Sequence, residues 1–286
     1  MQIPSKMAIF VTFHFVETRL PYLHTICQEF ASLGESVKVN IFTNNARRHA
    51  MIEAAVQCPN LDIEILSPTL LGHPYLLTWC HHSKARELFK SDPTISHFLY
   101  LEDDVRITQA NMIWWMKARA KLRRYGLYPG LMRYEVHPAT ETHYSTDVIA
   151  SAIYEDTSRL VLKDRSYAFL NLKYPYQGLA LLDRELMEEY LRMPDSEIDK
   201  SPWGIRETAN QYLTFWNVPP GFESRPMVGY DVNSQRIDPG CLVHHLPNTY
   251  VVHPKEPLGK VPLAELIQVR GNRDEGPRAA TQPRGH

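Results

Sequence analysis

The spacing of apolar positions changes repeatedly along the first 135 residues. Residues 7–13 form a continuous apolar run, which is typical of a strand covered on both faces. From Leu20 to Phe30, apolar residues then recur at three- and four-residue spacing, which predicts a helix with one buried stripe. Further along, the same succession predicts strands at 37–43, 61–66, 97–101 and 130–136, and helices at 46–56, 74–90 and 108–125. Strands and helices that alternate in this way indicate a parallel α/β sheet.

The second half of the chain has a different pattern. Residues 145–182 are expected to form short β segments joined by aromatic-rich turns. Helices are expected at 183–192 and 203–216, and a strand-like run at 241–252. From about residue 268 the chain is polar and rich in Gly, Pro and Arg, which predicts a disordered tail over 269–286. We therefore expect one domain over 1–268, with two halves that meet near residue 135.

Composition and charge exclude several classes of protein. The formal net charge of the 286 residues is -1, so no overall field favours nucleic acid or anionic lipid. No apolar run approaches the roughly 18 to 20 residues that span a bilayer. The four cysteines are scattered singly, so the sequence indicates neither a zinc site nor a disulfide framework. These features predict a cytoplasmic protein without a transmembrane segment, and they leave open a peripheral position at the inner face of the membrane.

An acidic cluster directly follows the strand expected at 97–101. It consists of Glu102, Asp103 and Asp104. Ligands bind outside the carboxyl ends of strands in open α/β sheets, and this cluster lies at such an end. Three adjacent carboxylates repel one another, and a hard cation such as Mn²⁺ or Mg²⁺ would relieve the repulsion while bridging to phosphate oxygens. The alternative is an acidic turn that simply follows a buried strand.

The segment FLYLEDDV resembles the DxD-type motif of GT-A glycosyltransferases, in its Glu-Asp-Asp form. The order of elements over residues 7–250 is similar as well. The resemblance implies a GT-A-like, Rossmann-type mixed α/β sheet with helices on both faces. It implies that the half up to residue 135 binds a nucleotide diphosphate and that residues 136–268 bind the acceptor. It further implies that Asp104 binds the metal, while Asp103 and Glu102 contact the ribose or donor sugar, or orient the metal through water.

Four further residues are candidates for donor binding. His14 and Arg19 lie in the loop after the first strand, which cradles the nucleobase in GT-A proteins, and the guanidinium fork of Arg19 matches phosphate oxygens. Asn44 ends the second strand and could contact the base or ribose, although a turn role is the alternative. Lys84, on the helix expected at 74–90, is within sequence reach of the diphosphate, and a solvated helical face is the alternative.

Histidines near the C-terminus are candidate metal ligands, because many GT-A enzymes add a late histidine to the metal site. His244 and His245 lie in a strand-like run, so alternation directs one inward and the other outward. Our interpretation leans slightly to His244 and keeps His245 open, with His253 as a third candidate. The adjacent His81 and His82 point in different directions on a helix and do not form a helical metal pair.

An inverting transfer also needs a general base near the acceptor. GT-A enzymes of this type place an acidic residue near the start of a helix in the second half, and Glu207 fits that description, with Asp199 as the reserve. Trp203 could stack on a sugar face. The alternative for Glu207 is a surface position on an amphipathic helix.

Residues 174–183 supply further acceptor candidates. Gly178 inside a β run predicts a close approach of backbone or ligand, and Tyr176 and Gln177 could line the acceptor or donor-sugar pocket. Core packing is the alternative for Tyr176.

The sequence therefore predicts a metal-dependent glycosyltransferase. Such an enzyme would move a sugar from a nucleotide-sugar donor to a hydroxyl of a glycan or lipid-linked saccharide, as in polysaccharide biosynthesis. Two alternatives remain: a sugar nucleotidyltransferase, and a catalytically silent glycan-binding protein of the same fold. P-loop, dinucleotide-binding, zincin and α/β-hydrolase motifs are absent from the sequence.

Overall fold

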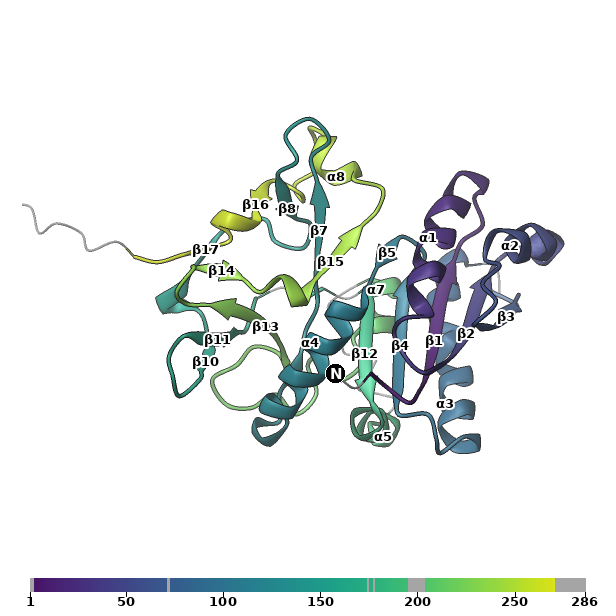
Figure 1. The fold of residues 1–286 in the computed structure, drawn as a ribbon, viewed down its shortest axis with the longest axis horizontal. Helices are drawn as coiled ribbons and strands as arrows, with labels where there is room; N and C mark the ends of the chain where they lie inside the picture. Colours follow the sequence, from purple (N-terminus) through teal and green to yellow (C-terminus); the bar gives the residue numbers. More distant parts are fainter. Residues whose placement is uncertain (1–2, 71–72, 174, 177, 195–203, 271–286) are drawn as a thin grey trace, which may run out of the picture.

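A five-stranded mixed sheet forms the first half of the molecule (Figure 1). The computed structural model describes residues 3–70, 73–173, 175–176, 178–194 and 204–270. The strand order is β12-β4-β1-β2-β3, from β1 (Lys6–Phe13), β2 (Ser36–Thr43), β3 (Asp62–Leu66), β4 (His97–Glu102) and β12 (Leu179–Asp183). The first four strands run parallel, and β12 lies antiparallel to β4 at the edge.

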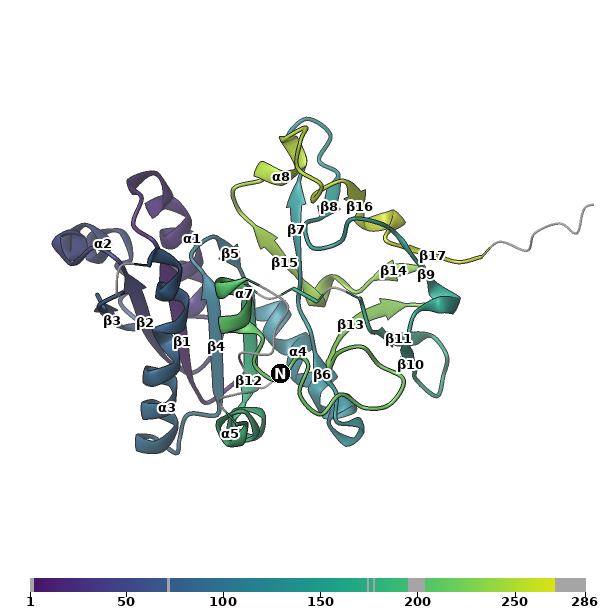
Figure 2. The same ribbon diagram turned by 180° about the vertical axis from the view of Figure 1, so that it is seen from behind.

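Helices cover both faces of this sheet, which is why β1 and β4 are almost continuously apolar and buried. The helices are α1 (Leu20–Phe30), α2 (His49–Ala55), α3 (His81–Ser91) and α5 (Arg184–Arg192). α1 packs against α2, and α3 packs against α5 and β1. α1 lies in front of the sheet in Figure 1, whereas α3 lies in front of it in Figure 2. The predicted fold class, a mixed α/β sheet with helices on both faces, is confirmed.

Short 3-10 segments extend several of the predicted helices. They are η1 (Glu17–Arg19) before α1, η2 (Ala46–Arg48) before α2, η3 (Pro74–Trp79) before α3 and η4 (Arg123–Tyr125) after α4 (Gln109–Leu122). Helix α4 begins at a capping box between Thr108 and Asn111, which satisfies two backbone donors of its first turn. The predicted helix boundaries in this half are therefore correct to within a few residues.

The second half consists mainly of two small sheets. One has the order β16-β8-β7-β15-β5, from β5 (Val105–Arg106), β7 (Met132–Val136), β8 (His143–Ser145), β15 (Leu242–His245) and β16 (Val261–Pro262). The other has the order β10-β11-β13-β14, with β6 beside β13, from β6 (Tyr128–Pro129), β10 (Arg159–Val161), β11 (Tyr167–Leu170), β13 (Pro226–Asp231) and β14 (Arg236–Ile237). A separate pair joins β9 (Ala152–Ile153) and β17 (Ile267–Gln268).

The two halves are interleaved along the chain. β12 and α5 come after residue 135 but belong to the first sheet, whereas β5 comes before it and belongs to the second half. The chain thus passes between the halves several times, and one of these passages occurs at the acidic cluster.

Two expected elements of the second half are shorter than predicted. The strand-like run at 241–252 ends at His245, because Pro247 and the left-handed Asn248 (φ 52°) turn the chain into α8 (Thr249–Val252). The helix expected at 203–216 is limited to α7 (Ile205–Asn210) among the described residues, and Tyr212 with φ 44° is incompatible with its continuation. The predicted tail falls almost entirely outside the described residues.

Within the described ranges, no helix combines the length and the apolar character needed to cross a membrane.

Candidate active site

The acidic cluster lies where the chain leaves one sheet and enters another. Glu102 is the last residue of β4, and Val105 is the first residue of β5. β5 pairs antiparallel with β15, and this register places His245 opposite Val105. The backbone N–H of Leu246 donates to the carbonyl oxygen of Asp104 at 2.9 Å. Backbone pairing therefore brings a histidine from the end of the chain to the acidic cluster.

Two carboxylates flank the imidazole of His245. Its Nε2 lies 3.3 Å from Oδ2 of Asp104, and its Nδ1 lies 2.6 Å from Oε1 of Glu135. Glu135 is held in turn by the backbone N–H of Val251, which donates to Oε2 at 2.7 Å. Burial alone would lower the pKa of His245, but the two carboxylates raise it. A neutral imidazole that donates from Nδ1 to Glu135 directs the lone pair of Nε2 towards Asp104.

Arg19 bridges the two aspartates of the cluster. Its Nε and Nη2 donate to the two oxygens of Asp103 at 2.8 Å each, and Nη2 also lies 2.8 Å from Oδ2 of Asp104. Burial nevertheless raises the pKa of Asp103 to about 7, and burial together with Asp104 raises the pKa of Glu102. Burial thus disfavours the charged forms of these two carboxyl groups, and a bound cation would favour them.

The arrangement of Asp104 and His245 fits a divalent cation. Oδ1 of Asp104 is buried and has no hydrogen-bond partner in the structure as described, which is costly for a carboxylate oxygen. Neighbouring ligands of an octahedral Mg²⁺ or Mn²⁺ ion lie roughly 3 Å apart, and the observed separation is 3.3 Å. The described residues contain no group of three metal-binding side chains. A cation here would therefore take two protein ligands and complete its shell with substrate oxygens and water.

A cleft of about 870 Å³ opens over this cluster, within the usual size range of ligand sites. Both halves of the molecule contribute to its lining. Eight of the predicted site residues line it: His14, Arg19, Glu102, Asp103, Asp104, Tyr176, Gly178 and Glu207.

Two predicted donor residues do not line the cleft. The side-chain oxygen of Asn44 accepts from the backbone N–H of Phe15 at 2.7 Å, and its Nδ2 lies 3.1 Å from Nε2 of His14. Asn44 thus holds the loop after β1, which is a turn role. The ammonium group of Lys84 lies 3.3 Å and 3.2 Å from carboxylates on β3 and α3, so it is engaged away from the cleft.

The two C-terminal histidines lie on opposite faces of β15. His244 stacks on Tyr134 with ring centroids 5.0 Å apart, and its Nε2 lies 3.1 Å from Asn248. The structure therefore brings His245, and not the slightly favoured His244, to Asp104. His253 is exposed after α8 and does not line the cleft.

The acceptor candidates are only partly described. Asp199, Trp203 and Gln177 lie outside the described residues. Glu207 lies in the first turn of α7, and one of its carboxylate oxygens is 3.7 Å from the guanidinium of Arg206. Its side chain retains 38% exposure, so it is accessible from the cleft.

The cleft residues that were missed in the sequence include Arg133, Asp147 and Tyr250. The guanidinium of Arg133 lies 4.4 Å from the ring centroid of Tyr176 and 5.6 Å from that of Tyr250. It also pairs with Asp147 at 3.1 Å. A signal was present, because Arg133 and Glu135 stand two residues apart in one strand and so share a face. Two charges on a buried face require partners.

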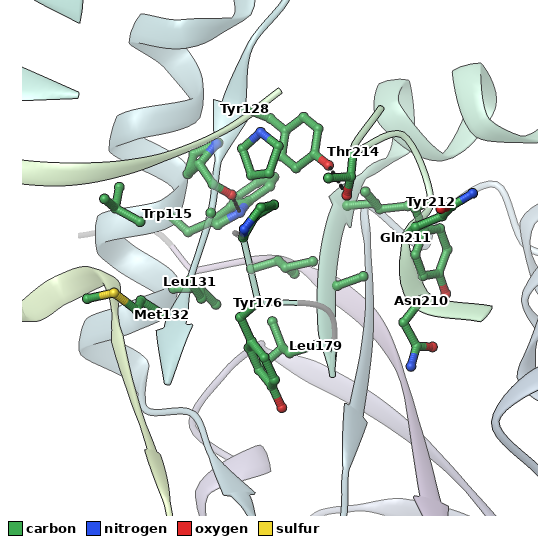
Figure 3. Close-up of a pocket in the computed structure, with 18 of the residues that line it drawn as sticks. Trp115, Tyr128, Leu131, Met132, Tyr176, Leu179, Asn210, Gln211, Tyr212 and Thr214 are labelled. Carbon is green, nitrogen blue, oxygen red and sulfur yellow. Dashed lines mark hydrogen bonds between the residues drawn. The ribbon is translucent and has the colours of Figure 1, made fainter. Parts of the chain in front are cut away.

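Tyr176 lines both the cleft and a second, smaller hollow of about 40 Å³. Figure 3 shows the smaller hollow. The hydroxyl of Tyr176 is buried without a hydrogen-bond partner among the described residues, and it points away from Trp115 and Tyr128 across the hollow. A Cβ atom on Gly178 would lie 2.2 Å from this hydroxyl, so glycine permits the ring to pack there. The hollow has room for a water molecule rather than a substrate.

Comparison with known proteins identifies no family. Neither a protein-family model nor a curated protein sequence matches this chain. The chain has a fold similar to that of 4-diphosphocytidyl-2C-methyl-D-erythritol synthase from Anaerococcus prevotii, with a TM-score of 0.35 and 11% identity over 75% of this chain and 83% of the other.

It is also similar to S. aureus TarS. A structure of TarS 1–349 gives a TM-score of 0.37 at 11% identity over 72% of this chain and 56% of the other. Another TarS structure gives 0.41 at 11% identity over 73% and 33%. The chain thus spans about half and about a third of these two TarS chains. Likenesses this distant carry no argument about activity, which has to come from the cleft itself.

Proposed function

We propose that this protein is a metal-dependent glycosyltransferase that uses a nucleotide-sugar donor. The observation that carries the proposal is the buried pair of Asp104 and His245, with its unpartnered carboxylate oxygen. Asp104 lines a cleft of substrate size, and His245 lies behind Asp104, 3.3 Å away. With a cation bound there, a diphosphate would supply oxygens to its coordination shell, and the rest of the cleft would hold nucleoside, sugar and acceptor.

Residues at the junction of the two halves bind and orient the donor. When bound, the divalent cation acts as a Lewis acid that stabilises the charge developing on the diphosphate leaving group. Asp104 and His245 hold it, and Glu135 fixes the imidazole tautomer through Nδ1. Arg19, tethered by Asp103, presents its guanidinium to the same cleft and binds a phosphate oxygen.

Residues of the second half face the acceptor. Glu207 accepts the proton of the acceptor hydroxyl as its oxygen bonds to the anomeric carbon and displaces the nucleoside diphosphate from the opposite side, so the configuration is inverted. Its place in the cleft lining and its partial exposure support this role. Arg133, Tyr176 and Tyr250 form the stacked wall against which a saccharide packs. The acceptor is a glycan or a lipid-linked saccharide.

A thermal-shift screen tests the proposal. UDP-, GDP-, CMP- and dTDP-sugars are added with and without Mn²⁺, and one donor should stabilise the protein only when Mn²⁺ is present. At a hundredfold excess over the dissociation constant, the expected gain is about 2.7 kcal/mol. Asp104→Asn is the matched control and should lose the metal-dependent part. If no nucleotide changes the melting temperature, the proposal is wrong.

The same material distinguishes the rival functions. A glycosyltransferase releases a nucleoside phosphate from the donor, whereas a nucleotidyltransferase releases pyrophosphate from a nucleoside triphosphate. A glycan-binding protein would be stabilised by saccharide without nucleotide or metal. The loop after β1, residues 14–19, contains one arginine and no lysine or glycine, which disfavours a triphosphate site there.

A further inference from the structure

Two histidines at the start of α3 and three tyrosines form a cluster that has no part in the chemistry proposed above. His81 and His82 begin α3, with ring centroids 4.0 Å apart, and His81 is fully buried. The ring of Tyr100 lies 4.1 Å from that of His81, and the ring of Tyr190 lies 5.8 Å from that of His82. Tyr212 contacts both imidazoles. The hydrogen-bond partners of the two imidazoles among the described residues are backbone carbonyl and tyrosine hydroxyl groups.

The hydrogen bonds of His82 define its tautomer. Nε2 lies 2.8 Å from the carbonyl oxygen of Ala209, and a carbonyl only accepts, so Nε2 carries the proton. Nδ1 then accepts from the hydroxyl of Tyr190 at 2.8 Å. Burial lowers the pKa of His82 to about 4, which keeps this imidazole neutral.

His82 and Trp79 together hold the helix that carries Glu207. The indole Nε1–H of Trp79 donates to the carbonyl oxygen of Ile205 at 3.0 Å. His82 donates to Ala209, four residues further along α7. These two hydrogen bonds, called the tethers below, therefore hold α7 before and after Glu207 in the sequence.

Helix α7 needs such support because it is only six residues long. A helix of this length does not persist on its own. The last backbone carbonyl groups of a helix have no hydrogen-bond partner within the helix. The carbonyl group of Ala209 is one of these in α7. The orientation of Glu207 therefore depends on groups outside α7.

We infer that Trp79 and His82 are positioning residues, which fix α7 so that Glu207 faces the cleft. The catalytic part of this inference rests on the role proposed for Glu207, whereas the structural part does not. Loss of either tether would allow α7 to open without disturbing Asp104 or His245, because those residues lie at the junction of β4, β5 and β15.

Amide hydrogen exchange tests the structural part without any substrate. His82→Ala should speed exchange of residues 205–210 by roughly five- to tenfold, the factor for loss of one hydrogen bond, and leave β1 unchanged. His82→Gln keeps an N–H at the matching position and should restore slow exchange. Trp79→Phe keeps an aromatic ring and removes only the indole N–H donor to Ile205. This variant replaces His82→Ala in the exchange measurement if His82→Ala does not fold. Lys90→Ala, an exposed change on the same helix, is the control.

Kinetics test the catalytic part. His82→Ala and Trp79→Phe should each lower kcat by roughly five- to tenfold while the donor KM stays constant, and His82→Gln should recover kcat. Unchanged exchange at 205–210 in both tether variants would overturn the inference, as would a donor KM that rises as much as kcat falls. Wild-type protein without any transfer activity would instead refute the proposed function, while the exchange result would still decide whether the tethers hold α7.

Discussion

The molecule contains two His-His pairs of identical sequence and different chemistry. His81 and His82 are on a helix, and both pack in one cluster with three tyrosines, where burial lowers the pKa of each. His244 and His245 are on a strand, and alternation separates them onto opposite faces. There the pKa of His244 is lowered by burial, whereas Asp104 and Glu135 raise that of His245.

The difference between the pairs shows what makes a histidine a candidate metal ligand. His82 uses one ring nitrogen on a carbonyl group and the other on a hydroxyl, so both are satisfied by the protein. His245 is oriented through Nδ1 by Glu135, and its Nε2 faces a carboxylate oxygen. Carboxylates on both sides of the ring, rather than the dipeptide, distinguish the candidate cation site.

The largest expected effect comes from Asp104→Asn. The change removes the anionic ligand and should reduce transfer by about a thousandfold or more, since the cation supplies several kcal/mol of charge stabilisation. The melting temperature without ligand should fall modestly, because the amide keeps the shape of the carboxylate but loses its ion pairs with Arg19 and His245. Steady-state assays of sugar transfer measure this effect. Activity close to that of the wild type would remove Asp104 from the site.

The next effect separates the two residues of the strand pair. His245→Ala should weaken Mn²⁺ binding by about a hundredfold, whereas His244→Ala should leave it unchanged, because the latter imidazole stacks on Tyr134 on the far face. Electron paramagnetic resonance of free Mn²⁺ during a titration measures both affinities. Equal losses in the two variants would contradict the assignment.

A smaller effect is expected from Glu135→Gln. The amide oxygen can still accept from Nδ1 of His245, but the negative charge that supports the ring is lost. Mn²⁺ affinity should therefore fall by about tenfold, the lower range for a group behind a metal ligand. The same titration applies. An affinity equal to that of the wild type would mean that Glu135 serves only the fold.

The titration of His82, in the helical pair, should affect how the stability of the protein depends on pH. The folded pKa of His82 is lowered to about 4 from 6.5, so the unfolded chain binds the proton first as the pH falls. The neutral imidazole of His82 makes its full contribution to the free energy of unfolding above pH 6.5. This contribution decreases between pH 6.5 and 4, by at most about 1.4 kcal/mol per pH unit. His82→Gln cannot titrate, so urea unfolding should show a shallower slope below pH 6.5. Parallel slopes would show that His82 is not buried as a neutral group.

Much of the first sheet was predictable because its signals are local. The continuous apolar run of β1 and the helical spacing of α1 each lie within one short segment. The acidic cluster was found for the same reason, since it directly follows a buried strand. Its predicted function in metal binding stays a prediction.

Features that depend on distant pairing were not predictable. Which face of β15 meets the acidic cluster is decided by its pairing with β5 and β7, so the sequence left His244 and His245 open. The return of β12 to the first sheet is likewise a long-range pairing. Lys84 was placed by sequence proximity, but carboxylates on β3 and α3 hold its ammonium group away from the cleft.

Coupled binding of Mn²⁺ and a nucleoside diphosphate tests the central claim most directly. Calorimetric titration of Mn²⁺ into wild-type protein, with and without the nucleotide, gives both affinities. If Asp104 and His245 hold a cation whose shell the diphosphate completes, the nucleotide should strengthen Mn²⁺ binding by about tenfold or more, and Mn²⁺ should strengthen nucleotide binding by the same factor. Independent binding of the two, or no binding of either, would contradict the account.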